Sequence, residues 1–343
     1  MARRKRKTLW SRSFQRTLTA MTRTAMRAGS KAMTQRLRSA PSARKRTSAK
    51  PTPASPAQWS TGVAIGAAGA RRYRLYTPPG VQRTERLPLV VMLHGCWQDA
   101  EALAASSQMN RIAAHQRFVV LYPEQDRLSN AHGCWNWYDT RSGRAQGEAG
   151  AIDAAIDQIC RLQPVDTDRI ALAGLSAGAG MAALLATRRP ERFRAIAMHS
   201  GIAPGVAHSS ATALSAMRGH RAADVPLAPI AAGTHLPALL VIHGSADRVV
   251  APSNGAEAAR LWAAQAGAKP SVPRTVQRGA RYAATITDYR TRGRLVATSC
   301  EINGLGHAWS GGAAGRAYSD PKGPDASRMI WAFAAKQFAS GTK

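Results

Sequence analysis

From residue 71 onward, the chain alternates short apolar runs with longer segments whose apolar residues recur at helical spacing. The apolar runs predicted to be strands span residues 73–76, 89–93, 118–122, 170–173, 195–198, 238–242 and 295–302. The segments predicted to be helices span residues 100–115, 147–162, 177–187, 253–266 and 325–338. Several strands are apolar throughout, which is what a sheet covered on both faces requires. The pattern therefore predicts an α/β fold: a doubly wound, mostly parallel sheet with helices on both faces.

Residues 1–60 do not follow this alternation and are predicted to precede a single domain at 61–343. Residues 1–50 contain 16 Lys or Arg and no Asp or Glu, so they carry more than half of the net charge of +29. Apolar side chains share one face of a predicted helix there: Trp10, Phe14, Leu18, Met21 and Ala25. Pro, Ser and Ala are frequent from residue 39 to residue 60, which is typical of a linker.

The basic arm, residues 1–50, has three interpretations. Its apolar stripe and basic surface suit docking on an anionic or amphipathic surface. A solubilising tail and an organellar transit peptide are the alternatives. The arm lacks the uninterrupted apolar stretch of a signal peptide, which favours a cytoplasmic location, with an extracellular one as the alternative. No apolar run in the sequence reaches the roughly 18 residues that a membrane span requires.

The cysteines bear on metal and disulfide chemistry. They are Cys96, Cys134, Cys160 and Cys300. No pair has the two-residue spacing of a zinc site, so we expect no structural metal. Cys96 and Cys134 lie in loops near the candidate site described below. The sequence leaves open whether they form a disulfide or are buried free thiols.

The run Gly-Leu-Ser-Ala-Gly at residues 174–178 lies between a predicted strand and a predicted helix. A serine on such a sharp turn is held in a strained conformation with its hydroxyl projecting from the sheet. The two glycines allow the strand and the following helix to approach closely. Ser176 is therefore the candidate nucleophile.

A serine nucleophile needs a base, an acid that orients the base, and donors for the oxyanion. Asp247 lies in the turn after strand 238–242, and His307 lies in a glycine-rich loop after strand 295–302. The chain order Ser176, Asp247, His307 is that of α/β-hydrolase triads. We expect Ser176 to attack an acyl carbon, His307 to transfer the proton and Asp247 to orient the imidazole.

The oxyanion donors are expected at residues 94–97, where the chain turns after a buried strand. The backbone N–H of Cys96 or Trp97 would join that of Ala177. Four tryptophans near these motifs form either a substrate cleft or part of the core: Trp97, Trp135, Trp137 and Trp309. Residues 203–236 are predicted to pass over the carboxyl edge of the sheet and to shape the substrate entrance.

Other polar residues have structural interpretations. Three histidines at strand ends are expected to be hydrogen-bonded structural residues: His94, His199 and His243. Ser200 lacks the nucleophile turn and is also expected to be structural. Asp153 and Asp157, four residues apart on a predicted helix, are expected to form a solvated face. No pair of carboxylates in the sequence is arranged for glycosidase chemistry.

Six short motifs carry a family resemblance. They are Leu-His-Gly-Cys at 93–96, Tyr-Pro-Glu-Gln at 122–125, Cys-Trp-Asn-Trp at 134–137, Gly-Leu-Ser-Ala-Gly at 174–178, His-Ser-Gly at 199–201 and the loop 304–311. With these motifs the chain resembles the esterase family of polyhydroxybutyrate depolymerases, whose similar relatives are feruloyl and acetylxylan esterases. The resemblance covers about residues 60–340. It implies an ester-hydrolysing α/β-hydrolase without metal or organic cofactor, with Ser176, Asp247 and His307 as its triad.

The sequence as a whole predicts a serine esterase. We expect it to hydrolyse short-chain hydroxyacyl esters, polyhydroxybutyrate or its oligomers, through an acyl-enzyme. The basic arm, residues 1–50, would then dock the enzyme on a polymer granule or another anionic surface, so a granule-associated location is expected beside the cytoplasmic one. A feruloyl or acetylxylan esterase is the enzymatic alternative. The alternative from another class is a binding protein of a granule surface or nucleic acid with a decayed hydrolase fold, since a basic arm provides phosphate affinity. The complete set of triad residues argues against it, and nucleic acid is not an expected partner.

Overall fold

The computed structural model describes residues 56–220 and 234–340. Most of the predicted arm and linker, residues 1–55, lies outside the described residues. The strands of the main sheet are β1 (Gln58–Gly66), β2 (Gly69–Thr77), β3 (Leu87–Leu93), β4 (Val119–Pro123), β5 (Val165–Leu175), β6 (Ala195–His199), β7 (Ala238–Gly244), β8 (Lys269–Pro270), β9 (Arg274–Val276), β10 (Ala284–Thr291) and β11 (Arg294–Ile302). Two short strands, β12 (Trp309–Ser310) and β13 (Ser319–Asp320), form a separate sheet.

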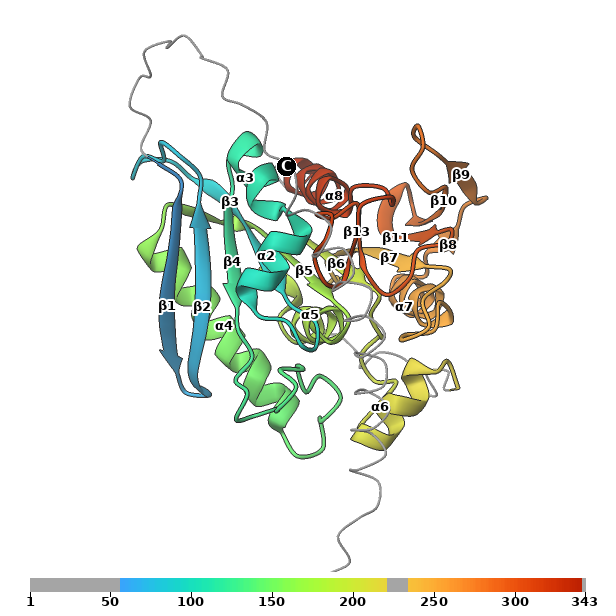
Figure 1. The fold of residues 1–343 in the computed structure, drawn as a ribbon, viewed down its shortest axis with the longest axis horizontal. Helices are drawn as coiled ribbons and strands as arrows, with labels where there is room; N and C mark the ends of the chain where they lie inside the picture. Colours follow the sequence, from blue (N-terminus) through green and yellow to red (C-terminus); the bar gives the residue numbers. More distant parts are fainter. Residues whose placement is uncertain (1–55, 221–233, 341–343) are drawn as a thin grey trace, which may run out of the picture.

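The main sheet follows the order β1-β2-β4-β3-β5-β6-β7-β11-β10-β8, with β9 paired to β10 (Figure 1). Neighbouring strands from β4 through β11 are parallel. The strands at the two edges pair antiparallel. This order confirms the predicted doubly wound, mostly parallel sheet. It also places the carboxyl ends of the parallel strands along one edge, where such folds bind ligands.

Helices cover both faces of the sheet (Figure 1). They are α2 (Ala100–Ser107), α3 (Met109–Gln116), α4 (Arg144–Leu162), α5 (Ala177–Arg188), α6 (Ser210–Met217), α7 (Ser253–Ala264) and α8 (Ala326–Ser340), with a 3-10 turn at Pro190–Arg192. In β3, Leu89 and Val91 belong to the core cluster that includes α4, α5 and α7, whereas Val90 and Met92 belong to the cluster that includes α2, α3 and α8. Because alternate residues of a strand point to opposite faces, both sets are buried, which explains the unbroken apolar run.

The structure contains elements that the sequence pattern did not predict, among them the short strands β8, β9, β12 and β13 and the helix α6. The predicted helix 100–115 is two helices, because Gln108 adopts a left-handed backbone with φ 55° between α2 and α3. The hydrophobic pattern also does not predict β1 or β10. In β1 only Ala64 is buried, and β10 is mostly half-buried, so neither has the apolar run of a central strand. β1 begins at Gln58, inside the segment assigned from the sequence to arm and linker.

The predicted excursion 203–236 contains α6, and its residues 221–233 lie outside the described part of the chain. α6 begins with a capping box in which Ser209 and Thr212 exchange side-chain and backbone hydrogen bonds. Of the helices that the structure describes, none has both the length and the apolar character needed to cross a bilayer.

Candidate active site

Ser176 occupies the sharp turn between β5 and α5. Its backbone has φ 56° and ψ −119°, a combination that residues other than glycine rarely adopt. The turn is held in place because the amide of Ser176 donates to the carbonyl of His199 at 2.8 Å. A β-carbon on Gly178 would overlap the carbonyl oxygens of Leu93 and His94, so a glycine is required where α5 passes β3. The strained serine turn expected from the sequence is therefore present.

Asp247 and His307 lie together in the loops that follow β7 and β11. His307 Nδ1 is 2.8 Å from Asp247 Oδ2. Asp247 Oδ1 accepts the amides of Val249 and Val250, each at 2.9 Å. Burial alone would raise the pKa of Asp247, but hydrogen bonds from His243 and His307 outweigh it and hold the pKa below its ordinary value. The buried carboxylate is thus charged at neutral pH and directed at the imidazole.

His243, near the end of β7, is a second histidine beside this carboxylate. Its Nε2 lies 3.0 Å from the Val250 carbonyl oxygen and 3.5 Å from Asp247 Oδ2. Its Nδ1 is buried and has no hydrogen-bond partner among the described residues. His243 therefore supports the turn that carries Asp247. A structural histidine was expected here, but the sequence does not indicate that it contacts Asp247.

The serine turn and the Asp–His pair are connected through β6. His199 accepts the Ser176 amide with its carbonyl and the Ser310 amide with Nε2. Within the described residues, no hydrogen bond joins Ser176 Oγ to His307 Nε2. Such bonds are often long in free enzymes and shorten when substrate binds. The arrangement therefore holds a formed acid–base pair and a separate serine at one edge of the sheet.

The turn after β3 was predicted to supply an oxyanion donor from Cys96 or Trp97. The amide of Trp97 donates to the carbonyl of His132 at 2.8 Å. Trp97 is therefore wrong as an oxyanion donor, because its N–H is already used. The amide of Cys96 donates to no described residue, and that of Ala177, the first residue of α5, has no partner within its helix. Both residues border the cavity described below.

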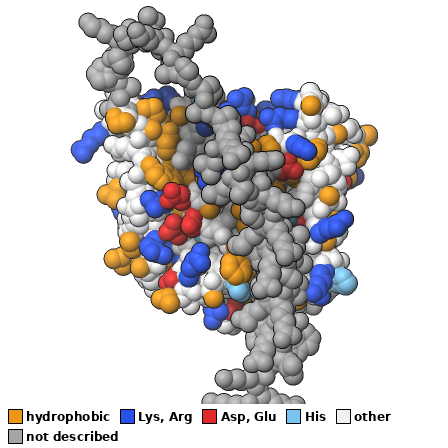
Figure 2. All heavy atoms as spheres, in the orientation of Figure 1, with side chains coloured by type: hydrophobic (Ala, Val, Ile, Leu, Met, Phe, Trp, Pro, Cys, Tyr) orange, Lys and Arg blue, Asp and Glu red, His pale blue; other side chains and the backbone are white. Residues whose placement is uncertain are grey.

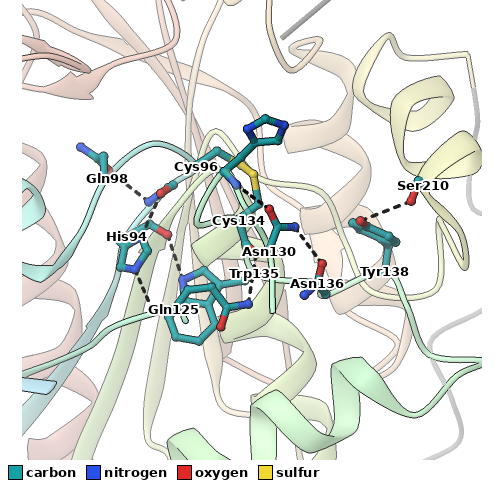
Figure 3. The surroundings of a disulfide bond; sticks show 12 residues. His94, Cys96, Gln98, Gln125, Asn130, Cys134, Trp135, Asn136, Tyr138 and Ser210 are labelled. Carbon is teal, nitrogen blue, oxygen red and sulfur yellow. Dashed lines mark hydrogen bonds between the residues drawn. A yellow bond between two sulfur atoms is a disulfide. The ribbon is translucent and has the colours of Figure 1, made fainter. Parts of the chain in front are cut away.

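A disulfide between Cys96 and Cys134 ties this turn to the loop 134–137 (Figure 3). The indole N–H of Trp135 donates to the carbonyl of His94 at 3.0 Å, which joins the same two segments a second time. The alternative left open by the sequence is thus resolved in favour of the bridge, and the two remaining cysteines are free. The turn with the free Cys96 amide is therefore held covalently.

A buried carboxylate on α4 anchors the same loop. Glu148 accepts the amide of Asn136 at 2.8 Å and Nε2 of Gln125 at 2.7 Å. The amide of Gln125 donates to His94 Nε2 at 3.1 Å, and burial lowers the pKa of His94 to about 4, so the ring is a neutral acceptor. His94 is structural, as expected. Sequence reasoning missed Glu148, because a carboxylate on a predicted helix normally faces water.

A small cavity of about 50 Å³ opens beside Ser176. Its lining is mainly apolar: Cys96, Cys134, Trp135, Trp137, Ala177, Gly201, Ile202, Ala213, Met217 and Val250. The polar members of the lining are Asn130, Tyr138, Ser176 and Ser200. Ala213 and Met217 belong to α6, so the excursion at 203–236 contributes a wall of the cavity beside Ser176, in line with the predicted role of this segment at the substrate entrance.

The four predicted substrate tryptophans divide into two groups. Trp135 and Trp137 line the cavity beside Ser176. Trp309 is fully buried and is a core residue. Trp97 packs against the ring of His132, with 4.3 Å between ring centroids, and does not line this cavity. Trp97 and Trp309 therefore correspond to the packing alternative.

Asp153, Asp157 and Ser200 were considered as alternatives to the candidate triad residues, and their contacts are structural. Asp153 is 2.7 Å from Arg189 and 2.7 Å from Arg192, and Asp157 also pairs with Arg192. The prediction of a solvated face is thus wrong for Asp153, because its side chain is only 14% exposed and forms ion pairs with Arg189 and Arg192. Ser200 Oγ lies 3.2 Å from His199 Nδ1, which agrees with a structural role.

Cavity size alone does not identify the site. A hollow of about 760 Å³ lies near the amino ends of β3, β5 and β6, with Leu87, Arg169 and Arg194 in its lining. It contains none of the residues of the candidate triad. Among the described residues, no group of three or more His, Cys, Asp or Glu is arranged to hold a metal ion.

Sequence comparison connects this geometry to named proteins. The chain is 34% identical over 175 residues to poly(3-hydroxyalkanoate) depolymerase C from Paucimonas lemoignei. This alignment covers 49% of this chain and 42% of that protein. It is 26% identical over 203 residues to the probable acetylxylan esterase A of Aspergillus clavatus. This second alignment covers 55% of this chain and 65% of that protein. The chain thus spans less than two thirds of the length of these curated relatives.

Solved structures share the fold. The acetyl xylan esterase from Aspergillus awamori aligns with a TM-score of 0.57 at 20% identity, covering 73% of this chain and 93% of that chain. An S-formylglutathione hydrolase from Agrobacterium tumefaciens aligns with a TM-score of 0.53 at 18% identity, covering 84% and 97%. These likenesses confirm the predicted α/β-hydrolase fold.

A sequence model of the family described as Esterase PHB depolymerase matches residues 71–267, more than half of the chain. The matched range includes the serine turn, the disulfide-linked loops and Asp247. His307 follows it in the chain and is joined to it by the contact with Asp247. The chain therefore belongs to the Esterase PHB depolymerase family.

Proposed function

We propose that this chain is a serine esterase in which Ser176 is the nucleophile, His307 the general base and acid, and Asp247 the residue that orients the imidazole. The observation that carries the proposal is the His307–Asp247 contact of 2.8 Å at the edge of the sheet where Ser176 is held in a strained turn. Family membership supports the same reaction class, because the named relatives are a depolymerase and an esterase.

In the proposed reaction, His307 Nε2 takes the hydroxyl proton of Ser176 as the oxygen attacks the ester carbonyl. The amides of Cys96 and Ala177 donate to the oxyanion, and loss of one such donor typically costs about 3 kcal/mol. His307 then protonates the departing alcohol and leaves an acyl-enzyme. Water, deprotonated by His307, then attacks this ester, and His307 returns the proton to Ser176 Oγ as the acid is released. Asp247 stays charged throughout and stabilises the imidazolium.

We propose short hydroxyacyl esters, including polyhydroxybutyrate or its oligomers, as the substrate class. The cavity beside Ser176 is small, about 50 Å³, which suits a short aliphatic acyl chain better than the ring of a feruloyl group. Its polar lining residues Asn130 and Tyr138 offer hydrogen-bond partners to a hydroxyl on the acyl chain. Acetylxylan is the second candidate, because an acetyl group also fits this cavity and a relative carries that name.

A substrate panel tests this proposal. Wild-type protein is assayed on a soluble butyryl ester, polyhydroxybutyrate particles, acetylated xylan and a feruloyl ester, with Ser176→Ala as the blank. We expect the highest kcat/KM on the butyryl ester, release of hydroxyacid from the particles, and feruloyl turnover lower by about 10²-fold, since the small cavity suits a short acyl chain better than a ring. Preference for the feruloyl ester would contradict the short-acyl assignment, and release from xylan alone would favour the second candidate.

We also propose that the basic arm, residues 1–50, docks the enzyme on a polyester granule or another anionic surface. The arm lies outside the described residues, so the proposal rests on its charge and apolar stripe. Deletion of residues 1–50 is expected to lower hydrolysis of particles by about tenfold and to leave kcat/KM on the soluble butyryl ester unchanged. The check is the ratio of the two rates, and an equal effect on both substrates would reject docking.

A further inference from the structure

His199 links the two halves of the candidate triad through separate atoms. It is the last residue of β6 and pairs in register with Leu175, the residue before the nucleophile. Its carbonyl oxygen accepts the amide of Ser176 at 2.8 Å. Its side-chain Nε2 accepts the amide of Ser310 at 3.1 Å. Ser310 lies three residues after His307, so one buried residue contacts both the serine turn and the histidine loop.

The surroundings of the His199 ring fix its tautomer. The ring is fully buried and stacks on Trp309, with 5.2 Å between centroids and 23° between planes. Burial first, and then electrostatic interaction with His243 and His307, lowers the pKa of His199 to about 3. The ring is therefore neutral at working pH. Because Nε2 accepts an amide, the proton is on Nδ1, which lies 3.2 Å from Ser200 Oγ.

The histidine loop has other anchors that do not depend on this ring. Trp309 donates its amide to the carbonyl of Tyr318 at 2.7 Å, and Gly311 donates to that of Asp320 at 2.8 Å. The amide of Ser310, between them, has only the His199 acceptor among the described residues, and Ser310 is fully buried. We expect the loop to stay folded but to shift away from β6 when this acceptor is removed, because a buried amide without a partner is unfavourable.

We propose that His199 is a positioning residue that sets the separation between Ser176 and His307. The inference rests on the proposed function and deepens it. His199 does not touch the reacting atoms or transfer a proton. It acts by holding the serine turn with its carbonyl and the histidine loop with Nε2, so that Ser176 and His307 stay within reach of a hydrogen bond that forms when substrate binds.

Two variants distinguish the effect of the His199 Nε2 acceptor from the effect of ring packing on Trp309. His199→Phe keeps a flat ring for stacking on Trp309 but has no acceptor. His199→Gln places an amide oxygen near the position of Nε2 and restores the acceptor. A matched control is Ile196→Val, which lies in the same buried strand away from the candidate site and destabilises by about 1 kcal/mol through lost packing.

We expect His199→Phe to lower kcat on the butyryl ester by about 10²-fold, the typical effect of a misplacement near 1 Å, with KM within about twofold of wild type. The rate at which a fluorophosphonate labels Ser176 should fall by the same factor. His199→Gln should recover most of both rates, and Ile196→Val should keep both while lowering the melting temperature.

The outcomes distinguish this inference from the proposed function. The proposed function is supported if fluorophosphonate labels the wild-type protein and does not label Ser176→Ala. The inference is then tested separately, by the ratio of kcat in His199→Phe to kcat in wild type and by the same ratio of labelling rates. The inference is overturned if folded His199→Phe has the same kcat and labelling rate as wild type. It is also overturned if His199→Phe and His199→Gln lose these rates to the same extent. If His199→Phe does not fold, a wild-type kcat in His199→Leu, which also lacks an acceptor, overturns it. Wild-type protein without turnover or labelling overturns both proposals.

Discussion

Replacement of Ser176 by alanine is expected to lower kcat on a butyryl ester by about 10⁶-fold, the size of effect found when the serine of a hydrolase triad is removed. The side chain lost is the one that would form the acyl-enzyme, and no other described hydroxyl in the cavity lies in a nucleophile turn. Ser200 is the nearest alternative in sequence, but its Oγ contacts the buried ring of His199 instead of His307.

The measurement is steady-state hydrolysis together with mass spectrometry of protein treated with a fluorophosphonate. Wild type should gain one label on the peptide that contains Ser176, and the alanine variant none. Ser340→Ala, at the exposed end of α8, is the matched control and should behave as wild type. Turnover by Ser176→Ala within tenfold of wild type would remove the proposed mechanism and leave the binding-protein alternative with a decayed hydrolase fold.

Much of the frame that positions this site could be predicted from hydrophobic pattern. Runs such as 89–93 and 238–242 are apolar throughout because both faces of a central parallel strand are covered, so burial leaves a direct mark in the sequence. Ser176, Asp247 and His307 were found because each follows a predicted strand and because their chain order is that of α/β-hydrolase triads. β1 and β10 have no such run, because β1 is largely exposed and β10 is mostly half-buried.

The details of the site depended on contacts that the pattern does not report. Whether the amide of Cys96 or of Trp97 is free depends on which one meets the carbonyl of His132, a residue more than thirty positions away in the chain. Glu148 has the spacing of an ordinary helix residue, and only the approach of loop 134–137 reveals that it is buried and bonded. The sequence likewise does not indicate that His199 accepts hydrogen bonds from both the serine turn and the histidine loop.

Replacement of Asp247 by asparagine is expected to lower kcat by about 10⁴-fold without loss of the fold. Asparagine retains one oxygen, which the amides of Val249 and Val250 require as their acceptor. Its NH₂ group then faces His307 Nδ1 and favours the tautomer protonated on Nε2. That tautomer cannot accept the proton of Ser176, so attack on the ester is slow even though the residues remain in place.

The same variant tests the charge on Asp247 through stability. The pKa of Asp247 is lower in the folded protein than its ordinary value of about 3.9, so its stabilising contribution is complete above that value and is lost as the pH falls through the folded-state pKa. The melting temperature of Asp247→Asn should therefore lie furthest below wild type at pH 7, and the gap should narrow toward pH 3. A gap that is constant with pH would show that the carboxylate is not stabilised by His243 and His307. A kcat within tenfold of wild type would show that His307 does not depend on this carboxylate for its tautomer.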